Sequence, residues 1–155
     1  MVSGVTLEGQ QWAEMPYRFE AGTPNIGGVI ALGAAVDFLR DHVHLADRQK
    51  EEASLARRMR HYVSEVDGAR VFGDAGDNSP ICSFSLAGIH PHDVAQYCDE
   101  FNVAIRAGHL CAQPLVNALG VPALCRASLA VYNEENDLKV LADALRACAR
   151  FFHVS

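Results

Sequence analysis

At 155 residues, 50% of them hydrophobic, the chain is long enough to bury the core of one domain without the help of disulfides. Its formal net charge of -6 argues against nucleic acid and against an anionic membrane as partners, because both attract clustered Lys and Arg. The 5 cysteines show no framework spacing, and no signal peptide or long apolar run is evident, which predicts a cytoplasmic protein with reduced thiols.

The N-terminal part is expected to contain an irregular segment and two helices. Residues 1–24 mix polar stretches with aromatic residues and proline, and a turn at its end leaves Asn25 as the cap of a helix over residues 26–43. This helix is small and apolar almost all round, so it is either buried on most sides or packed closely against a partner. A second, amphipathic helix is predicted at about residues 46–66.

Beyond residue 68 the apolar period changes from helical to extended. Strands are predicted at 70–73, 81–87, 103–106 and 125–132, with a surface loop over 73–80. Helices are predicted at 90–102, at 114–119 and at 134–154, the last as a closing amphipathic helix. Strands in pairs with helices between them predict an α+β fold, in which a four-stranded, mainly antiparallel sheet is covered by helices on one face.

Residues 106–114 read RAGHLCAQP and bring together a thiol, an imidazole, a guanidinium and a turn-forming glycine. A cysteine attacks as its thiolate, and nearby cations stabilise that form. Arg106 and His109 are the candidate cations for Cys111. The alternative is that Cys111 is one more small buried residue.

The remaining cysteines suggest less chemistry. Cys82, Cys98 and Cys148 fall at apolar positions and are predicted to be buried, whereas Cys125 at a strand start is either buried or reactive. Neither a Cys-x-x-Cys nor a His-x3-His pair occurs, so no metal site is predicted.

Two further positions are suited to binding anions. Arg126 enters a strand between apolar neighbours, which is costly unless the guanidinium meets an anion such as a carboxylate. An internal ion pair with one of the 19 acidic residues is the alternative that composition alone favours. Gly22 and Thr23 precede a helix N-terminus, where backbone N–H groups and a hydroxyl can bind phosphate, although ordinary capping explains them equally well.

In combination, three segments resemble the C-terminal part of a SUF-type cysteine desulfurase, of the class V aminotransferase-like family that includes the selenocysteine lyases. They are RFEAGTPN at 18–25 with two glycines after it, RAGHLCAQP at 106–114, and CRASLAVYN at 125–133. The resemblance covers essentially the whole chain, in the family's order. It implies that residues 25–155 form the small C-terminal domain, with its leading helix, of a fold-type I pyridoxal-phosphate enzyme, and that residues 1–24 reach a dimer interface.

The resemblance implies an enzyme that takes sulfur from L-cysteine, leaving L-alanine and a persulfide on an enzyme cysteine, and passes the sulfur to an acceptor protein for iron–sulfur cluster assembly. Cys111 matches the persulfide-forming nucleophile, and Arg126 matches the arginine that holds the substrate α-carboxylate. The substrate-binding positions that it implies are Arg126, Arg106, His109 and Asn25. Gly22 and Thr23 match residues that reach the cofactor phosphate in the other subunit of a homodimer.

The sequence departs from the family pattern in two ways. The family commonly has two histidines before the cysteine, and the second is Leu110 here, which bears on proton transfer and on the thiolate of Cys111. The family's cofactor lysine follows a histidine in an upstream domain, whereas Lys50 and Lys139 lie on predicted polar helix faces. Family members have an internal methionine where Met1 stands, so a C-terminal fragment or truncated reading frame, inactive alone, is expected.

A second function remains open, in which the chain is a non-catalytic module that keeps the small-domain fold and binds a desulfurase partner or a sulfur carrier. The apolar helix over residues 26–43 would face the large domain of a family member. The isolated chain is therefore expected to expose an apolar patch and to self-associate.

Overall fold

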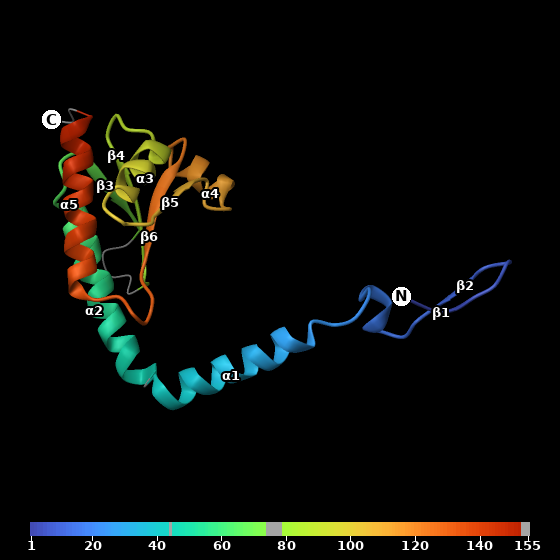
Figure 1. Cartoon of the computed structure of the whole chain (residues 1–155). Coiled ribbons are helices and arrows are strands. Elements are labelled where there is room, and N and C mark those ends of the chain that lie inside the picture. The colour runs from blue at the N-terminus through green and yellow to red at the C-terminus, as the bar shows by residue number, and fades with distance from the viewer. Residues whose placement is uncertain (44, 74–78, 153–155) are drawn as a thin grey trace. The chain divides into compact units, whose positions relative to one another are not determined.

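The structure is a computed structural model that describes residues 1–43, 45–73 and 79–152. It divides into two compact units, Met1–Leu45 and Ala46–Ser155 (Figure 1). Within the described residues, no helix is both long enough and apolar enough to cross a membrane.

The first unit begins with a hairpin in place of the irregular segment expected for residues 1–24. β1 (Val2–Val5) pairs antiparallel with β2 (Gln10–Trp12), and the Thr6 N–H donates to the carbonyl oxygen of Gly9 at 2.8 Å to close the turn. A single helical turn, η1 (Tyr17–Phe19), follows. The β-formers on either side of a short turn are sufficient for a hairpin, which the polar composition of the segment conceals. The expected role of this segment at a dimer interface stays a prediction.

The long helix of the first unit, α1 (Ile26–His42), begins where the sequence predicts. The side-chain oxygen of Asn25 accepts the N–H of Gly28 at 3.0 Å, which confirms Asn25 as the helix cap. No residue of α1 is buried, and its exposed large apolar side chains are Ile26, Val29, Ile30, Leu32, Val36, Phe38 and Leu39. The first unit by itself therefore leaves α1 exposed, and burial on most sides and packing against a partner both stay predictions.

The second unit is built on a four-stranded sheet, as the α+β prediction requires. The strand order is β3-β4-β6-β5, and every neighbouring pair is antiparallel. The strands are β3 (Ala69–Phe72), β4 (Ile81–Leu86), β5 (Arg106–Gly108) and β6 (Leu124–Ser128). The helices are α2 (Leu45–Ser64), α3 (Pro91–Asp99), α4 (Gln113–Ala118) and α5 (Glu135–Phe151). Parts of the predicted 73–80 loop (74–78) and of the last predicted helix (153–154) lie outside the described residues.

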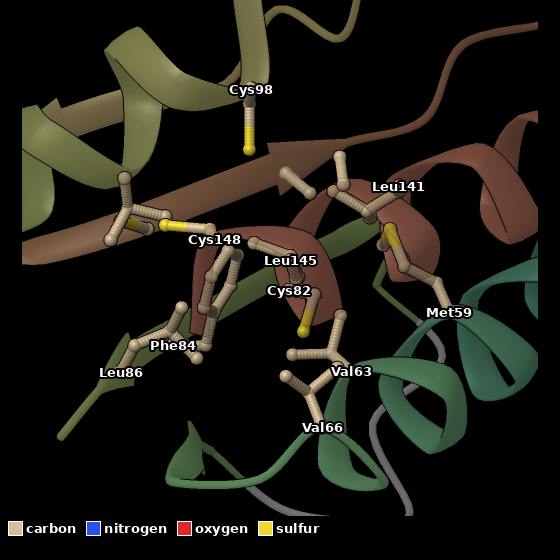
Figure 2. Packing of buried hydrophobic residues seen from close by; sticks show 14 of the residues in the cluster. Met59, Val63, Val66, Cys82, Phe84, Leu86, Cys98, Leu141, Leu145 and Cys148 are labelled. Atoms are coloured by element: carbon tan, nitrogen blue, oxygen red, sulfur yellow. The ribbon is translucent and has the colours of Figure 1, made fainter. Parts of the chain in front are cut away.

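The main core fills one face of this sheet. Alternate residues of β4 and β6 are buried there against apolar side chains of α2, α3 and α5. Figure 2 shows Phe84 and Cys82 of β4 beside Val63 of α2 and Leu145 of α5. The prediction that helices cover one face of the sheet holds for α2, α3 and α5, whereas the short helix α4 packs on the other face.

The opposite face, which we call the open face, carries the alternate strand residues. Cys125 and Ala127 of β6 are in the main core, so Arg126 between them points to the open face. A second, smaller apolar cluster of Phe72, Val116 and Leu124 lies on this side, where α4 packs. Arg126 therefore lies outside the main core, on the open face of the sheet.

Candidate active site

Two arginines stand side by side on the open face. Arg106 of β5 and Arg126 of β6 are direct cross-strand partners, so their side chains leave the sheet on the same side. Like charges at such a position destabilise a sheet. Within the described residues neither arginine forms an ion pair with an acidic side chain, and Nε of Arg126 is buried without a hydrogen-bond partner. The internal ion pair that composition favours for Arg126 is thus not found among the described residues, and the pair of guanidinium groups is suited to an external anion.

Cys111 is in contact with Arg106, one of these two arginines. Nη2 of Arg106 donates to Sγ of Cys111 at 3.0 Å. Cys111 is the one exposed thiol of the 5, and all of them lie in described segments. The contact places a cation next to the exposed thiol. The alternative that Cys111 is a small buried residue is therefore wrong.

The turn that carries Cys111 has an uncommon backbone. The N–H of Ala112 donates to the carbonyl oxygen of His109 at 2.8 Å, and the two residues between them, Leu110 and Cys111, have φ angles of 56° and 59°. This is the left-handed pattern of a type I′ turn, for which Asn and Gly are the usual residues. Leucine and cysteine at these positions store strain, which the surrounding structure must balance.

His109 is the first residue of this turn, and its ring is exposed. Its carbonyl oxygen closes the turn. Among the described residues the ring makes no hydrogen bond, so the structure does not join it to Cys111. Its predicted action on Cys111 or on the substrate stays a prediction.

Leu110 is a residue of the site that the sequence analysis treats only as a departure from a family pattern. Its side chain is partly buried and packs against the second cluster of Phe72, Val116 and Leu124. It also lines a cavity of about 310 Å³ on the open face, together with residues of β4 and α4. The sequence around Leu110 does not indicate this packing, because Phe72 lies far away in the chain.

The other four thiols are buried and unreactive. Burial raises the pKa of Cys82 to about 11 and the pKa values of Cys98 and Cys125 to about 12. Burial also raises the pKa of Cys148. The open question about Cys125 is thereby answered, since it is fully buried and its Sγ lies 3.5 Å from the carbonyl oxygen of Pro91. Among the described residues, no group of three or more His, Cys, Asp and Glu side chains is placed to hold a metal ion.

Gly22, Thr23 and Asn25 belong to the first unit. Gly22 has a φ of 75°, which glycine adopts readily, and it places Thr23 just before α1. The side-chain oxygen of Asn25 is occupied by the N–H of Gly28. Their predicted roles in cofactor and substrate binding stay predictions, because the two units are described separately.

Comparisons with known proteins agree in sequence and in structure. The family described as Aminotransferase class-V matches residues 1–141. A probable cysteine desulfurase of Halalkalibacterium halodurans is 41% identical over 152 residues, which are 98% of this chain and 37% of that protein. A cysteine desulfurase of Cronobacter sakazakii is 41% identical over 146 residues, which are 94% of this chain and 36% of that protein.

Among solved structures, the cysteine desulfurase CsdA of Escherichia coli, in an S-sulfonic acid form, superimposes with a TM-score of 0.81 at 34% identity. The match covers 97% of this chain and 37% of the CsdA chain. The apo cysteine desulfurase of Thermococcus onnurineus gives a TM-score of 0.80 at 32% identity, over 97% of this chain and 38% of the other. The chain thus spans somewhat over a third of the length of the proteins that it matches.

Proposed function

This chain belongs to the class-V aminotransferase family, and on that basis we propose that it is the nucleophile-bearing, C-terminal part of a pyridoxal-phosphate-dependent cysteine desulfurase of the SUF type. The observation that carries the proposal is the contact of Cys111 with Arg106, beside Arg126 on the open face. The similarity to named cysteine desulfurases supports the same activity.

In the proposed reaction, Cys111 takes the sulfur of L-cysteine. The Cys111 thiolate attacks the substrate sulfur, so that an S–S bond forms while the carbon–sulfur bond breaks. The carbon keeps the bonding electrons and takes up a proton, giving L-alanine and a persulfide on Cys111. When bound, pyridoxal phosphate supplies the electron sink that makes this bond cleavage possible.

Arg126 fits the substrate α-carboxylate. Its planar guanidinium can donate two parallel hydrogen bonds to a carboxylate, and its buried Nε has no partner of its own. Arg106 holds the thiol and adds positive charge to the same place. An anion between the two arginines would relieve the repulsion between their charges.

The start of α1 fits the cofactor phosphate. Gly22 and Thr23 offer backbone N–H groups and a hydroxyl at the positive end of a 17-residue helix. In the proposal they serve the site of the other subunit of a homodimer. Asn25 and His109 line the substrate, and the exposed imidazole of His109 exchanges a proton with it.

The lysine that anchors the cofactor is proposed to come from polypeptide outside these 155 residues. The two lysines of the chain, Lys50 on α2 and Lys139 on α5, are exposed on helices that cover the opposite face of the sheet from Arg126. Neither is placed to serve the open face. The chain by itself is therefore proposed to be inactive toward L-cysteine.

A second candidate function is that of a non-catalytic module that binds a desulfurase partner or a sulfur carrier. The exposed apolar residues of α1 favour it, because a stretch of this kind is typical of a surface that another protein covers. It differs from the first proposal in requiring no reaction at Cys111.

A hybrid enzyme distinguishes the two proposed functions. In it, residues 1–155 replace the matching part of a full-length relative, such as the Halalkalibacterium protein. The hybrid, supplied with pyridoxal phosphate, is expected to release L-alanine from L-cysteine, whereas the 155-residue chain alone releases none. Cys111→Ser in the hybrid is expected to abolish turnover. A folded, cofactor-loaded hybrid that binds L-cysteine without releasing alanine would favour the module instead.

A further inference from the structure

We propose that Leu110 is the positioning residue that presents Cys111 to Arg106, by anchoring a strained turn in the apolar cluster of the open face. The inference refines the proposed function, since it takes Cys111 to be the reactive thiol. The proposed link between the apolar side chain of Leu110 and the thiol of Cys111 is argued from the geometry of this chain.

The turn that carries Cys111 has a strained backbone. Leu110 and Cys111 are consecutive left-handed residues, and neither is glycine or asparagine. A branched or bulky side chain is unfavourable in this backbone region, so the turn relaxes unless other contacts hold it. The hydrogen bond from Ala112 to His109 closes the turn but does not fix its orientation on the sheet.

Leu110 is anchored in the second apolar cluster. The side chain of Leu110 enters the cluster formed by Phe72 of β3, Val116 of α4 and Leu124 of β6. These three residues come from separate elements, so the leucine is held from several sides. With Leu110 fixed, the next residue along the turn has little freedom, and its side chain is directed away from the cluster and out to solvent.

The anchored turn aligns Cys111 with Arg106. Sγ of Cys111 lies 3.0 Å from Nη2 of Arg106, and Arg106 is fixed in register against Arg126. A displacement of the turn away from β5 would lengthen and weaken this hydrogen bond. Leu110 therefore acts on the thiolate through position, although its own side chain is apolar and touches none of the reacting atoms.

Alkylation of Cys111 by iodoacetamide in the purified 155-residue chain tests this link, because it needs neither cofactor nor L-cysteine. The rate is measured in a double-mutant cycle of Arg106→Gln and Leu110→Asn, with the labelled residue identified by peptide mass mapping. Asparagine is close to leucine in shape and accepts the left-handed backbone, so Leu110→Asn relieves strain while it removes the apolar anchor.

With Leu110 in place, Arg106→Gln is expected to slow alkylation near neutral pH roughly tenfold, since it removes the cation that stabilises the thiolate. In the Leu110→Asn background, the same change is expected to slow alkylation less than about twofold, because the thiol no longer meets Arg106. Leu110→Met, which restores an apolar side chain, is expected to restore the dependence on Arg106.

Two controls protect the interpretation. Leu115→Asn changes an exposed leucine that lines the same cavity but lies outside the turn, and it is expected to leave the dependence on Arg106 intact. The four buried cysteines report folding, because they react only if the unit opens. If Leu110→Asn exposes them, Leu110→Ala takes its place with the same expectation.

Equal slowing by Arg106→Gln in both backgrounds would overturn the proposal, as would a wild-type rate that does not depend on Arg106. Either result leaves the desulfurase proposal standing, because the hybrid enzyme tests that one separately. An inactive hybrid, conversely, would leave the coupling between Leu110 and Cys111 unchanged.

Discussion

Exposure separates Cys111 from the other four cysteines of the chain. Cys111 lies at the surface beside a guanidinium, whereas the others are packed in the main core. Water is excluded from the four buried thiols, which pack as small apolar residues, whereas the exposed Cys111 is free to carry out the reaction proposed for it.

The buried thiols predict an alkaline loss of stability. In the unfolded chain they lose their protons near their ordinary pKa of 9.0, whereas in the folded chain Cys98 and Cys125 keep them until about 12. The stability that neutral burial provides is complete below about pH 9 and declines as the pH rises toward 12. Each such thiol lowers the free energy of unfolding by up to about 1.4 kcal/mol per pH unit in that window.

Urea unfolding at about pH 8 and about pH 10 measures this decline. Cys98→Ala is the control, because it removes one of the thiols and should reduce the loss between the two pH values. An identical loss in the variant would mean that Cys98 does not contribute to the pH dependence.

Arg126 is predicted to cost stability in exchange for binding. Its Nε is buried without a partner, and it faces the like charge of Arg106. Arg126→Leu should therefore raise the free energy of unfolding by roughly 1 kcal/mol. The same change in the hybrid enzyme should lower kcat/KM for L-cysteine by about tenfold to a hundredfold, because the substrate carboxylate loses the two hydrogen bonds that the guanidinium would donate.

Thermal unfolding of the 155-residue chain measures the expected gain in stability, and turnover of the hybrid enzyme measures the expected loss of activity. Arg70→Leu is a matched control, since Arg70 lies exposed on β3 over the ring of Phe72 and should affect turnover little. A marked loss of stability in Arg126→Leu would show that Arg126 has a structural partner in the folded chain.

At the scale of the elements, the start of α1 depends on one glycine. A Cβ at Gly28 would lie 2.8 Å from Cγ and 2.9 Å from Oδ1 of Asn25 and would also overlap its Nδ2, so it would displace the cap. A Cβ at Gly33 in the same helix would meet nothing within 4 Å. Gly33→Ala should stabilise α1 by about 1 kcal/mol, whereas Gly28→Ala should give little or none of this gain.

Helical circular dichroism as a function of temperature distinguishes the two variants. Asn25→Ala, which removes the cap directly, should lower the helical signal and should make Gly28→Ala favourable in the double variant. Equal gains from the two glycine substitutions in the presence of Asn25 would count against the cap as the reason for Gly28.

The sequence predicts the order and type of most elements better than their pairing. The apolar neighbours of Arg126 in the sequence single out this arginine, but its position on the face opposite the main core follows from the strand pairing in the structure. β5 is predicted at 103–106 but lies at Arg106–Gly108, because alternation reports which side is buried and not where a neighbouring strand begins to pair. β6 ends at Ser128 where the chain turns, with the N–H of Ala130 donating to Oδ1 of Asn133 at 2.7 Å.

The site shows the same limit. Cys111 and Arg106 are close in sequence, so their contact is predictable, and the resemblance to a known family identifies Arg126 as well. The left-handed turn at Leu110 and its packing against Phe72 depend on tertiary contacts, and leucine carries no local preference for such a turn. Local patterns therefore find the reactive groups, while the residue that positions them needs the fold.

The chain covers 37% of the Halalkalibacterium relative, and within the first unit no residue of α1 is buried. Exposed apolar side chains along a whole helix are expected to drive self-association of the isolated chain. Gel filtration over a range of concentrations should show oligomers that grow with concentration. Ile30→Lys, which puts a charge on an exposed position of α1, should reduce them, and a clean monomer at high concentration would contradict the expectation.

In the proposed reaction the sulfur of L-cysteine passes to Cys111. A single turnover of the hybrid enzyme with isotopically labelled L-cysteine, followed by mass mapping of every cysteine peptide, tests this transfer directly. We expect one added sulfur atom, on the peptide of Cys111, and none in the Cys111→Ser variant. Labelled sulfur on another cysteine, or its retention in Cys111→Ser, would show that Cys111 is not the acceptor.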